Sequence, residues 1–195
     1  MPRTKKYIDL YNSEYGTNEQ LPSELVVRFE EINNETYPQV RVTLNSEQVG
    51  DIIDDNSYSN DGYRYHDVFH YTFATLLGWS PCARAMLKRK RKSNDDLDRI
   101  EDGARAAITE EAISLIIFNN ARNNDYFNKR TKVDDTILTI IKNMTEPFEV
   151  RLRSKTEWEK AILKSYEMFR CLIENGGGII NFNLENKNII YQKLN

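Results

Sequence analysis

The apolar pattern of this sequence changes period at Tyr65, and that change limits the chain to folds that combine strands with helices. Residues 25–30 and 39–44 are rich in β-branched side chains that partly alternate with polar ones, and the turn-forming residues 33–36 lie between them. Residues 179–191 show the same strand character around a polar turn. We therefore expect an α+β fold that has a predominantly helical core, an N-terminal β-hairpin and a C-terminal β-hairpin.

Helical spacing of apolar residues dominates the middle of the chain. Gly78 ends the first helical run, and Ser80 with Pro81 is typical of the start of a second helix. Thr156 and Glu159 fit a capping box before the last helix. The expected helices cover residues 5–12, 65–77, 81–87, about 98–121, a run that starts at 134 or 135, and 156–174. The helix over about 98–121 is apolar on nearly all sides toward its end, so we expect it to be central.

Length and composition favour a single domain. The 195 residues divide into an N-terminal hairpin and acidic loop (1–62), a helical core (63–174) and a C-terminal hairpin (175–195). The 27 Lys and Arg against 30 Asp and Glu leave a formal charge of −3, which excludes a generally basic nucleic-acid coat. No apolar run approaches the roughly 20 residues of a membrane span, and no secretory signal is visible. We therefore expect no membrane association. Cys82 and Cys171 lie far apart and lack Cys-x-x-Cys spacing, so we expect reduced cysteines in a cytoplasmic protein.

Both histidines of the chain lie in one short motif. His66 and His70 are four residues apart, so on a helix they project from one face about 5–6 Å apart at Cβ, with Asp67 beside them. Further carboxylates follow at Glu101, Asp102, Glu110 and Glu111. A metal site of His66, Asp67, His70, Glu101, Asp102 and Glu111 would hold Mg²⁺ or Mn²⁺ mainly through oxygen, or Zn²⁺ mainly through nitrogen. The alternative is a histidine pair on the surface or in a capped core position.

Glu110 and Glu111 are the candidate catalytic residues, because they interrupt an otherwise apolar run at residues 108–113. Buried carboxylates are costly unless they are paired or bound to a cation. The alternative is the first turn of a helix capped by Thr109, where the dipole favours them. The segment from His66 to His70 also looks like a zincin motif with Asp in place of Glu, which leaves a peptidase as a weaker alternative.

Five consecutive cations, Lys88, Arg89, Lys90, Arg91 and Lys92, are the candidate substrate-binding residues, together with Arg64 before the histidine motif. A cationic run beside an acidic metal cluster suits a polyphosphate, whose remaining oxygens Lys and Arg would neutralise. Such a run at a helix end is also often only solvated, and local binding of nucleic acid is the competing function.

Several sequence blocks resemble one bacterial family, the domain found at the C-terminus of some MazG-type nucleotide pyrophosphohydrolase proteins. The resemblance spans roughly residues 49–191, and its blocks occur in order: Val49-Gly50-Asp51, Asp61-Gly62-Tyr63-Arg64-Tyr65-His66-Asp67-Val68-Phe69-His70, Leu77-Gly78-Trp79-Ser80-Pro81, Lys88-Arg89-Lys90-Arg91-Lys92, Glu101-Asp102-Gly103-Ala104-Arg105 and Glu110-Glu111-Ala112.

The resemblance implies metal-dependent hydrolysis of nucleoside triphosphates or related phosphorylated nucleotides. The MazG fold proper is all-α and carries Glu-x-x-Glu and Glu-x-x-Asp motifs; here Ser114 stands where the Asp would follow Glu111. In this mechanism Mg²⁺ or Mn²⁺ activates a water, and Glu110 or Glu111 is its base. A nucleotide substrate is the expected partner, and a homodimer is left open. The alternative function is a non-catalytic module that binds nucleotides or nucleic acid.

Overall fold

The computed structural model describes residue 12, residues 14–32 and residues 36–194. Two sequence expectations fall outside these residues: the short helix over residues 5–12, apart from Asn12, and the turn at residues 33–35.

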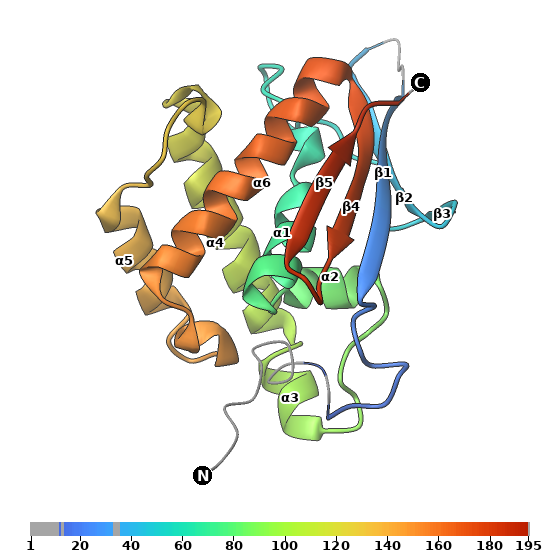
Figure 1. Ribbon diagram of the computed structural model, residues 1–195, viewed down its shortest axis with the longest axis vertical. Helices are drawn as coiled ribbons and strands as arrows, with labels where there is room; N and C mark the ends of the chain where they lie inside the picture. The colour runs from blue at the N-terminus through green and yellow to red at the C-terminus, as the bar shows by residue number, and fades with distance from the viewer. Residues whose placement is uncertain (1–11, 13, 33–35, 195) are drawn as a thin grey trace.

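One antiparallel sheet of five strands forms a side of the molecule (Figure 1), in the order β3-β2-β1-β4-β5. Its strands are β1 (Glu24–Ile32), β2 (Gln39–Leu44), β3 (Glu47–Gln48), β4 (Gly177–Asn183) and β5 (Asn188–Gln192). Apolar side chains alternate along the strands, so that one face of the sheet is buried. That face carries Leu25, Val27, Phe29, Val40, Val42, Ile180, Phe182 and Ile189.

The expectation of two separate hairpins around a helical core was wrong. β1 pairs with β4 in antiparallel register, from Glu24 opposite Asn183 to Glu30 opposite Gly177. This pairing joins the N-terminal and C-terminal strands into one sheet. Gly177 suits this junction, because its φ is +122° and an added Cβ would lie 2.5 Å from the carbonyl oxygen of Phe29. Local periodicity predicts strands but not partners from opposite ends of a chain, which is why the sequence suggested two hairpins.

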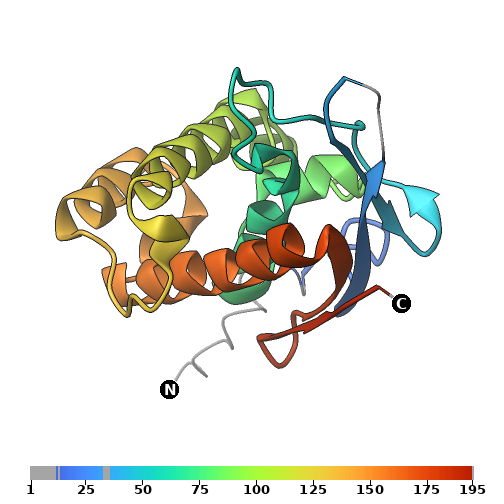
Figure 2. The ribbon, with the colours of Figure 1, turned by 90° about the horizontal axis from the view of Figure 1, so that it is seen from above.

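The described helices lie largely on the buried side of the sheet (Figures 1 and 2). They are α1 (Asp67–Leu77), α2 (Pro81–Met86), α3 (Asp95–Ile100), α4 (Ala104–Arg122), α5 (Asp135–Met144) and α6 (Lys155–Asn175), with short 3₁₀ turns η1 (Tyr63–Tyr65), η2 (Asp125–Phe127) and η3 (Glu149–Leu152).

The signals for helix ends were partly correct. Gly78 ends α1 in the left-handed conformation, and Ser80 caps α2 by accepting a hydrogen bond from the Ala83 amide. The capping box of α6 is formed by Ser154 and Glu157, two residues before the predicted pair. The single helix expected over 98–121 is instead α3 and α4, which are separated at residues 101–103.

The central helix is α1, which corrects the expectation for residues 98–121. Ten of the eleven α1 residues are buried, and α1 lies in the middle of the molecule in Figure 2. Tyr71 on α1 contacts Phe182 of the sheet (ring centroids 5.6 Å apart), and Phe69 contacts Tyr166 of α6 (4.9 Å). α4 keeps an exposed face, where Ile108 is 68% exposed. The histidine motif therefore enters the core, because it belongs to the most buried helix.

Candidate metal centre

The start of α1 brings both histidines and Asp67 together. His66 is the N-cap residue of α1 and Asp67 is its first residue, with His70 one turn further. The two imidazole rings lie 5.7 Å apart between centroids, and one ligand atom from each of the three residues lies within 4.8 Å of the others. The ring of Tyr63 stacks on His66 at 4.4 Å. These three residues therefore have the spacing that a shared ion requires.

Glu110 of α4 fixes the orientation of His70. Its side chain is fully buried, and its Oε1 accepts a hydrogen bond from His70 Nδ1 at 2.8 Å. Ser80 Oγ donates to the same oxygen at 2.6 Å, and the Cys82 amide donates to Oε2 at 2.9 Å. Both carboxylate oxygens are thus engaged at the start of α2, and Glu110 serves as a support for the ring.

The other ring nitrogen of His70, Nε2, is not held by Glu110. Nε2 is buried, makes no well-formed hydrogen bond among the described residues, and lies at ion-pair distance, 3.2 Å, from Glu111 Oε1. Burial lowers the pKa of His70, but the neighbouring Glu110 charge and the hydrogen bonds around the ring outweigh burial, so the pKa lies well above its usual value. The two carboxylates, Glu110 and Glu111, therefore favour the protonated form of His70.

Glu111 is the accessible carboxylate of the site, with its side chain 46% exposed. Its Oε1 also accepts from the Cys82 thiol at 3.5 Å. Burial raises the pKa of Glu111, but the hydrogen bond and charge of His70 outweigh it and hold the pKa at about 2. Burial lowers the pKa of His66 and outweighs the charge of Asp67. At neutral pH, Glu111 is ionised and His66 is a neutral imidazole able to donate a lone pair.

An open pocket of about 540 Å³ exposes this cluster to solvent. It lies between α1, α2 and α4 and is lined by Tyr63, Asp67, His70, Cys82, Ala85, Met86, Ala107, Ile108, Glu111, Ala112 and Leu115. Its charged and imidazole groups thus come from α1 and α4, and apolar side chains of α2 and α4 complete the pocket.

Glu101 and Asp102 do not join this cluster. Asp102 is buried and accepts hydrogen bonds from Arg91, with Nη2 and Oδ1 2.7 Å apart. The Glu101 carboxylate accepts from the Glu149 amide at 3.0 and 3.1 Å. Both predicted ligands instead join the segment between α3 and α4 to the rest of the helical layer.

The five cations have different environments. Arg91 is 1% exposed and also pairs with Glu149, with Nη2 and Oε1 2.8 Å apart. Arg89 donates to the carbonyl oxygen of Thr17 at 3.0 Å. Lys90 is half-buried, whereas Lys88 and Lys92 are exposed. The run is therefore not one continuous cationic surface.

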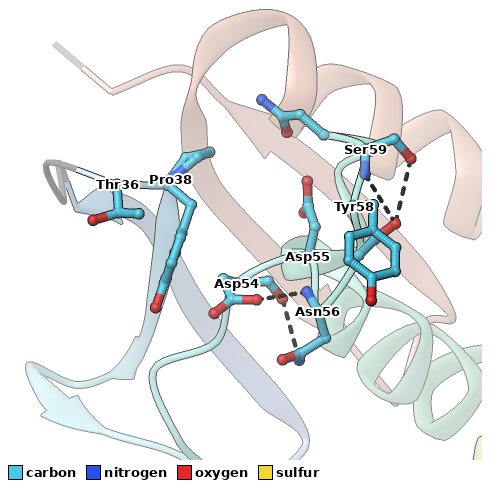
Figure 3. A pocket seen from close by; sticks show the side chains of 10 residues that line it. Thr36, Pro38, Asp54, Asp55, Asn56, Tyr58 and Ser59 are labelled. Atoms are coloured by element: carbon cyan, nitrogen blue, oxygen red, sulfur yellow. Dashed lines mark hydrogen bonds between the residues drawn. The ribbon is translucent and has the colours of Figure 1, made fainter.

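Arg64 lies away from the pocket, on the other side of η1. Its guanidinium pairs with Asp55 (Nη1 to Oδ2, 2.9 Å) and Glu31 (Nη2 to Oε2, 3.2 Å) and holds the acidic loop against β1. That loop lines a second pocket of about 720 Å³, formed by residues 36–38 and 54–60 (Figure 3). In this structure Arg64 has a packing role.

Sequence reasoning missed three residues of the site. Ser80 was identified as a helix cap, but its bond to Glu110 was not foreseen, and neither was the position of Cys82. Met86 contributes an apolar wall. No local sequence signal indicates the contacts of Ser80 and Cys82 with Glu110, because they join residues about thirty positions apart.

The fold and the site together define an α+β domain in which a carboxylate-supported histidine faces an open pocket beside further ligand groups. A family model described as the MazG C-terminal domain matches residues 6–195, so the chain belongs to the MazG C-terminal domain family. No curated protein and no solved structure matches the chain. Among the described residues, no helix combines the length and apolar character needed to cross a membrane.

Proposed function

We propose that this pocket binds a divalent metal ion and hydrolyses a phosphoanhydride bond of a nucleoside triphosphate or a related phosphorylated nucleotide. The observation that carries the proposal is the environment of His70: Glu110 holds Nδ1, and His70 lines the pocket with Nε2 3.2 Å from the Glu111 carboxylate, in reach of an ion that both could bind. Metal-ligating histidines are typically held in this way by a carboxylate behind the ring.

The donor set fits a divalent ion. His66, Asp67 and His70 supply two imidazoles and a carboxylate, and Glu111 can supply a second carboxylate. Imidazole ligands suit Zn²⁺, whereas carboxylates suit Mg²⁺ and Mn²⁺, so we favour Mn²⁺ for a mixed set of two imidazoles and two carboxylates. A bound ion would polarise the phosphoryl group and lower the pKa of a coordinated water.

Different side chains of the pocket would then have different roles in the reaction. Glu110 is fully buried with both oxygens engaged, so it positions His70 and does not reach the reacting atoms. Glu111 is ionised and partly exposed at the pocket, and it is the residue we assign to orient the attacking water and to take its proton. Ala107, Ile108 and Leu115 give the pocket an apolar surface that a nucleotide could contact.

Turnover of a nucleotide panel tests the proposal. Release of pyrophosphate or phosphate is measured with Mn²⁺, Mg²⁺ or Zn²⁺ and with a chelator, for the wild type and Glu111→Gln. Glu146→Gln is the matched control, because Glu146 is exposed beyond the end of α5. We expect metal-dependent turnover that Glu111→Gln abolishes and Glu146→Gln leaves unchanged. Nucleotide binding without any turnover would reject hydrolysis and favour a non-catalytic binding module.

A further inference from the structure

The turn after α2 determines where Lys88 points. Leu87 ends the helix, and Lys88 follows it with a φ of +56°. The Arg89 amide donates to the Arg84 carbonyl oxygen at 2.8 Å, and the Lys88 amide donates to the Ala85 carbonyl oxygen. These two bonds form a Schellman motif, in which the left-handed position is usually a glycine. The motif reverses the chain direction at Lys88.

Lys88 lines a small pocket of about 320 Å³ with the β2–β3 turn. Leu44, Val49, Met86 and Leu87 give it apolar walls, and Asn45, Glu47, Gln48 and Lys88 provide polar groups. In the part of the chain that the structure describes, no hydrogen bond or ion pair engages the Lys88 ammonium group. The charge of Lys88 is therefore available to a ligand.

This small pocket adjoins the candidate metal centre. Met86 lines both pockets. Gly50 follows β3 closely, and a Cβ added to it would lie 3.5 Å from Met86 Sδ and 3.8 Å from Asp67 Oδ2. The two pockets thus share Met86, next to Gly50, and the first contributes carboxylate and imidazole groups while the second contributes a lysine.

We propose that Lys88 binds a phosphate group of the substrate beyond the one held at the metal centre, so that the site selects nucleoside di- and triphosphates over monophosphates. The proposal rests on the proposed function. Arg91 and Arg89 are engaged by Asp102 and Thr17, respectively, so neither supplies this contact. Glu47 is the other charged residue of the small pocket and is exposed on β3, where its negative charge would repel a bound phosphate. Lys88 and Glu47 should therefore have opposite effects on affinity.

The left-handed position of Lys88 permits a sharp experiment. Glycine favours this backbone conformation, so Lys88→Gly removes the ammonium group without lowering the melting temperature. Lys129 has the same φ of +56° and is exposed beyond η2, so Lys129→Gly is the matched control. Calorimetric titration with Mn²⁺ present measures the affinity for a non-hydrolysable triphosphate analogue and for the corresponding monophosphate.

We expect Lys88→Gly to weaken triphosphate binding about tenfold, as for one charged contact, and to change monophosphate binding much less. Glu47→Gln should strengthen triphosphate binding, and Lys129→Gly should change neither affinity. Equal triphosphate affinity in Lys88→Gly and the wild type would overturn the assignment, and so would a wild type that binds no triphosphate. Tight, Lys88-dependent binding without turnover would support this subsite and reject only the hydrolysis.

Discussion

Replacing Glu110 by glutamine tests the support of His70 most sharply, because the change keeps the shape and removes the charge. The amide nitrogen of glutamine can donate but not accept, and every neighbour of Glu110 is a donor: His70 Nδ1, Ser80 Oγ and the Cys82 amide. In either orientation a buried donor faces another donor, and the His70 ring loses the carboxylate that favours its protonated form.

The expected cost follows from this geometry. Breaking one side of a buried, hydrogen-bonded charge pair costs about 3–5 kcal/mol of the free energy of unfolding. For a chain of this size, that corresponds to a fall in melting temperature of roughly 6–20 °C. Loss of the carboxylate behind a ligating histidine typically lowers metal affinity about 10–100-fold. Urea unfolding measures the stability, and calorimetric titration with Mn²⁺ measures the affinity of the folded variant.

Ser80→Ala is the matched control for Glu110→Gln. It removes one donor to Glu110 and the cap of α2, which should cost about 1–2 kcal/mol, and it leaves the bond between His70 and Glu110 in place. We expect its Mn²⁺ affinity to change less than that of Glu110→Gln. A folded Glu110→Gln protein with the Mn²⁺ affinity of the wild type would refute the supporting role of Glu110.

Three further predictions concern the fold. Arg91→Ala should lower the free energy of unfolding by about 3 kcal/mol in urea titrations, because it removes the hydrogen bonds from Arg91 to buried Asp102 and, among the described residues, leaves only the Arg84 cation, 3.8 Å away; a loss below about 1 kcal/mol would contradict this. Glu157→Ala removes half of a capping box and should cost about 1 kcal/mol at pH 7. Partial burial raises the pKa of Glu157, but its cap hydrogen bonds lower it overall, so the difference from the wild type should shrink as the pH falls through that lowered pKa; a difference that stays constant after the carboxylate is protonated would count against the cap. Gly177→Ala should destabilise the sheet by about 1–3 kcal/mol, because its Cβ would meet the Phe29 carbonyl oxygen, and a melting temperature equal to that of the wild type would disprove the close approach.

The parts of this fold that sequence reasoning predicts are the local ones. The helical spacing of α1, its end at Gly78 and the cap at Ser80 each depend on residues within a few positions of one another. The pairing of β1 with β4 depends on partners from opposite ends of the chain, and an alternating pattern does not identify such partners.

The candidate site shows the same division. A spacing of four residues was enough to place His66 and His70 on one face of a helix. Nothing in the sequence distinguishes Glu110, which is buried behind His70, from Glu111, which is exposed at the pocket, because this difference depends on how α4 packs against α1 and α2. For the same reason Asp102 resembled a metal ligand, although its carboxylate is engaged by Arg91.

The position of a bound ion is the measurement that tests the central claim most directly. Crystals of the full chain grown with Mn²⁺ would locate the ion by its anomalous scattering. The account predicts one peak in the pocket between α1 and α4, within bonding distance of His70 Nε2 and a carboxylate oxygen of Asp67, and no peak there in His66→Ala/His70→Ala crystals. A wild-type protein whose pocket stays without a peak at saturating Mn²⁺, or whose only peak lies away from His70, would contradict the proposed metal centre.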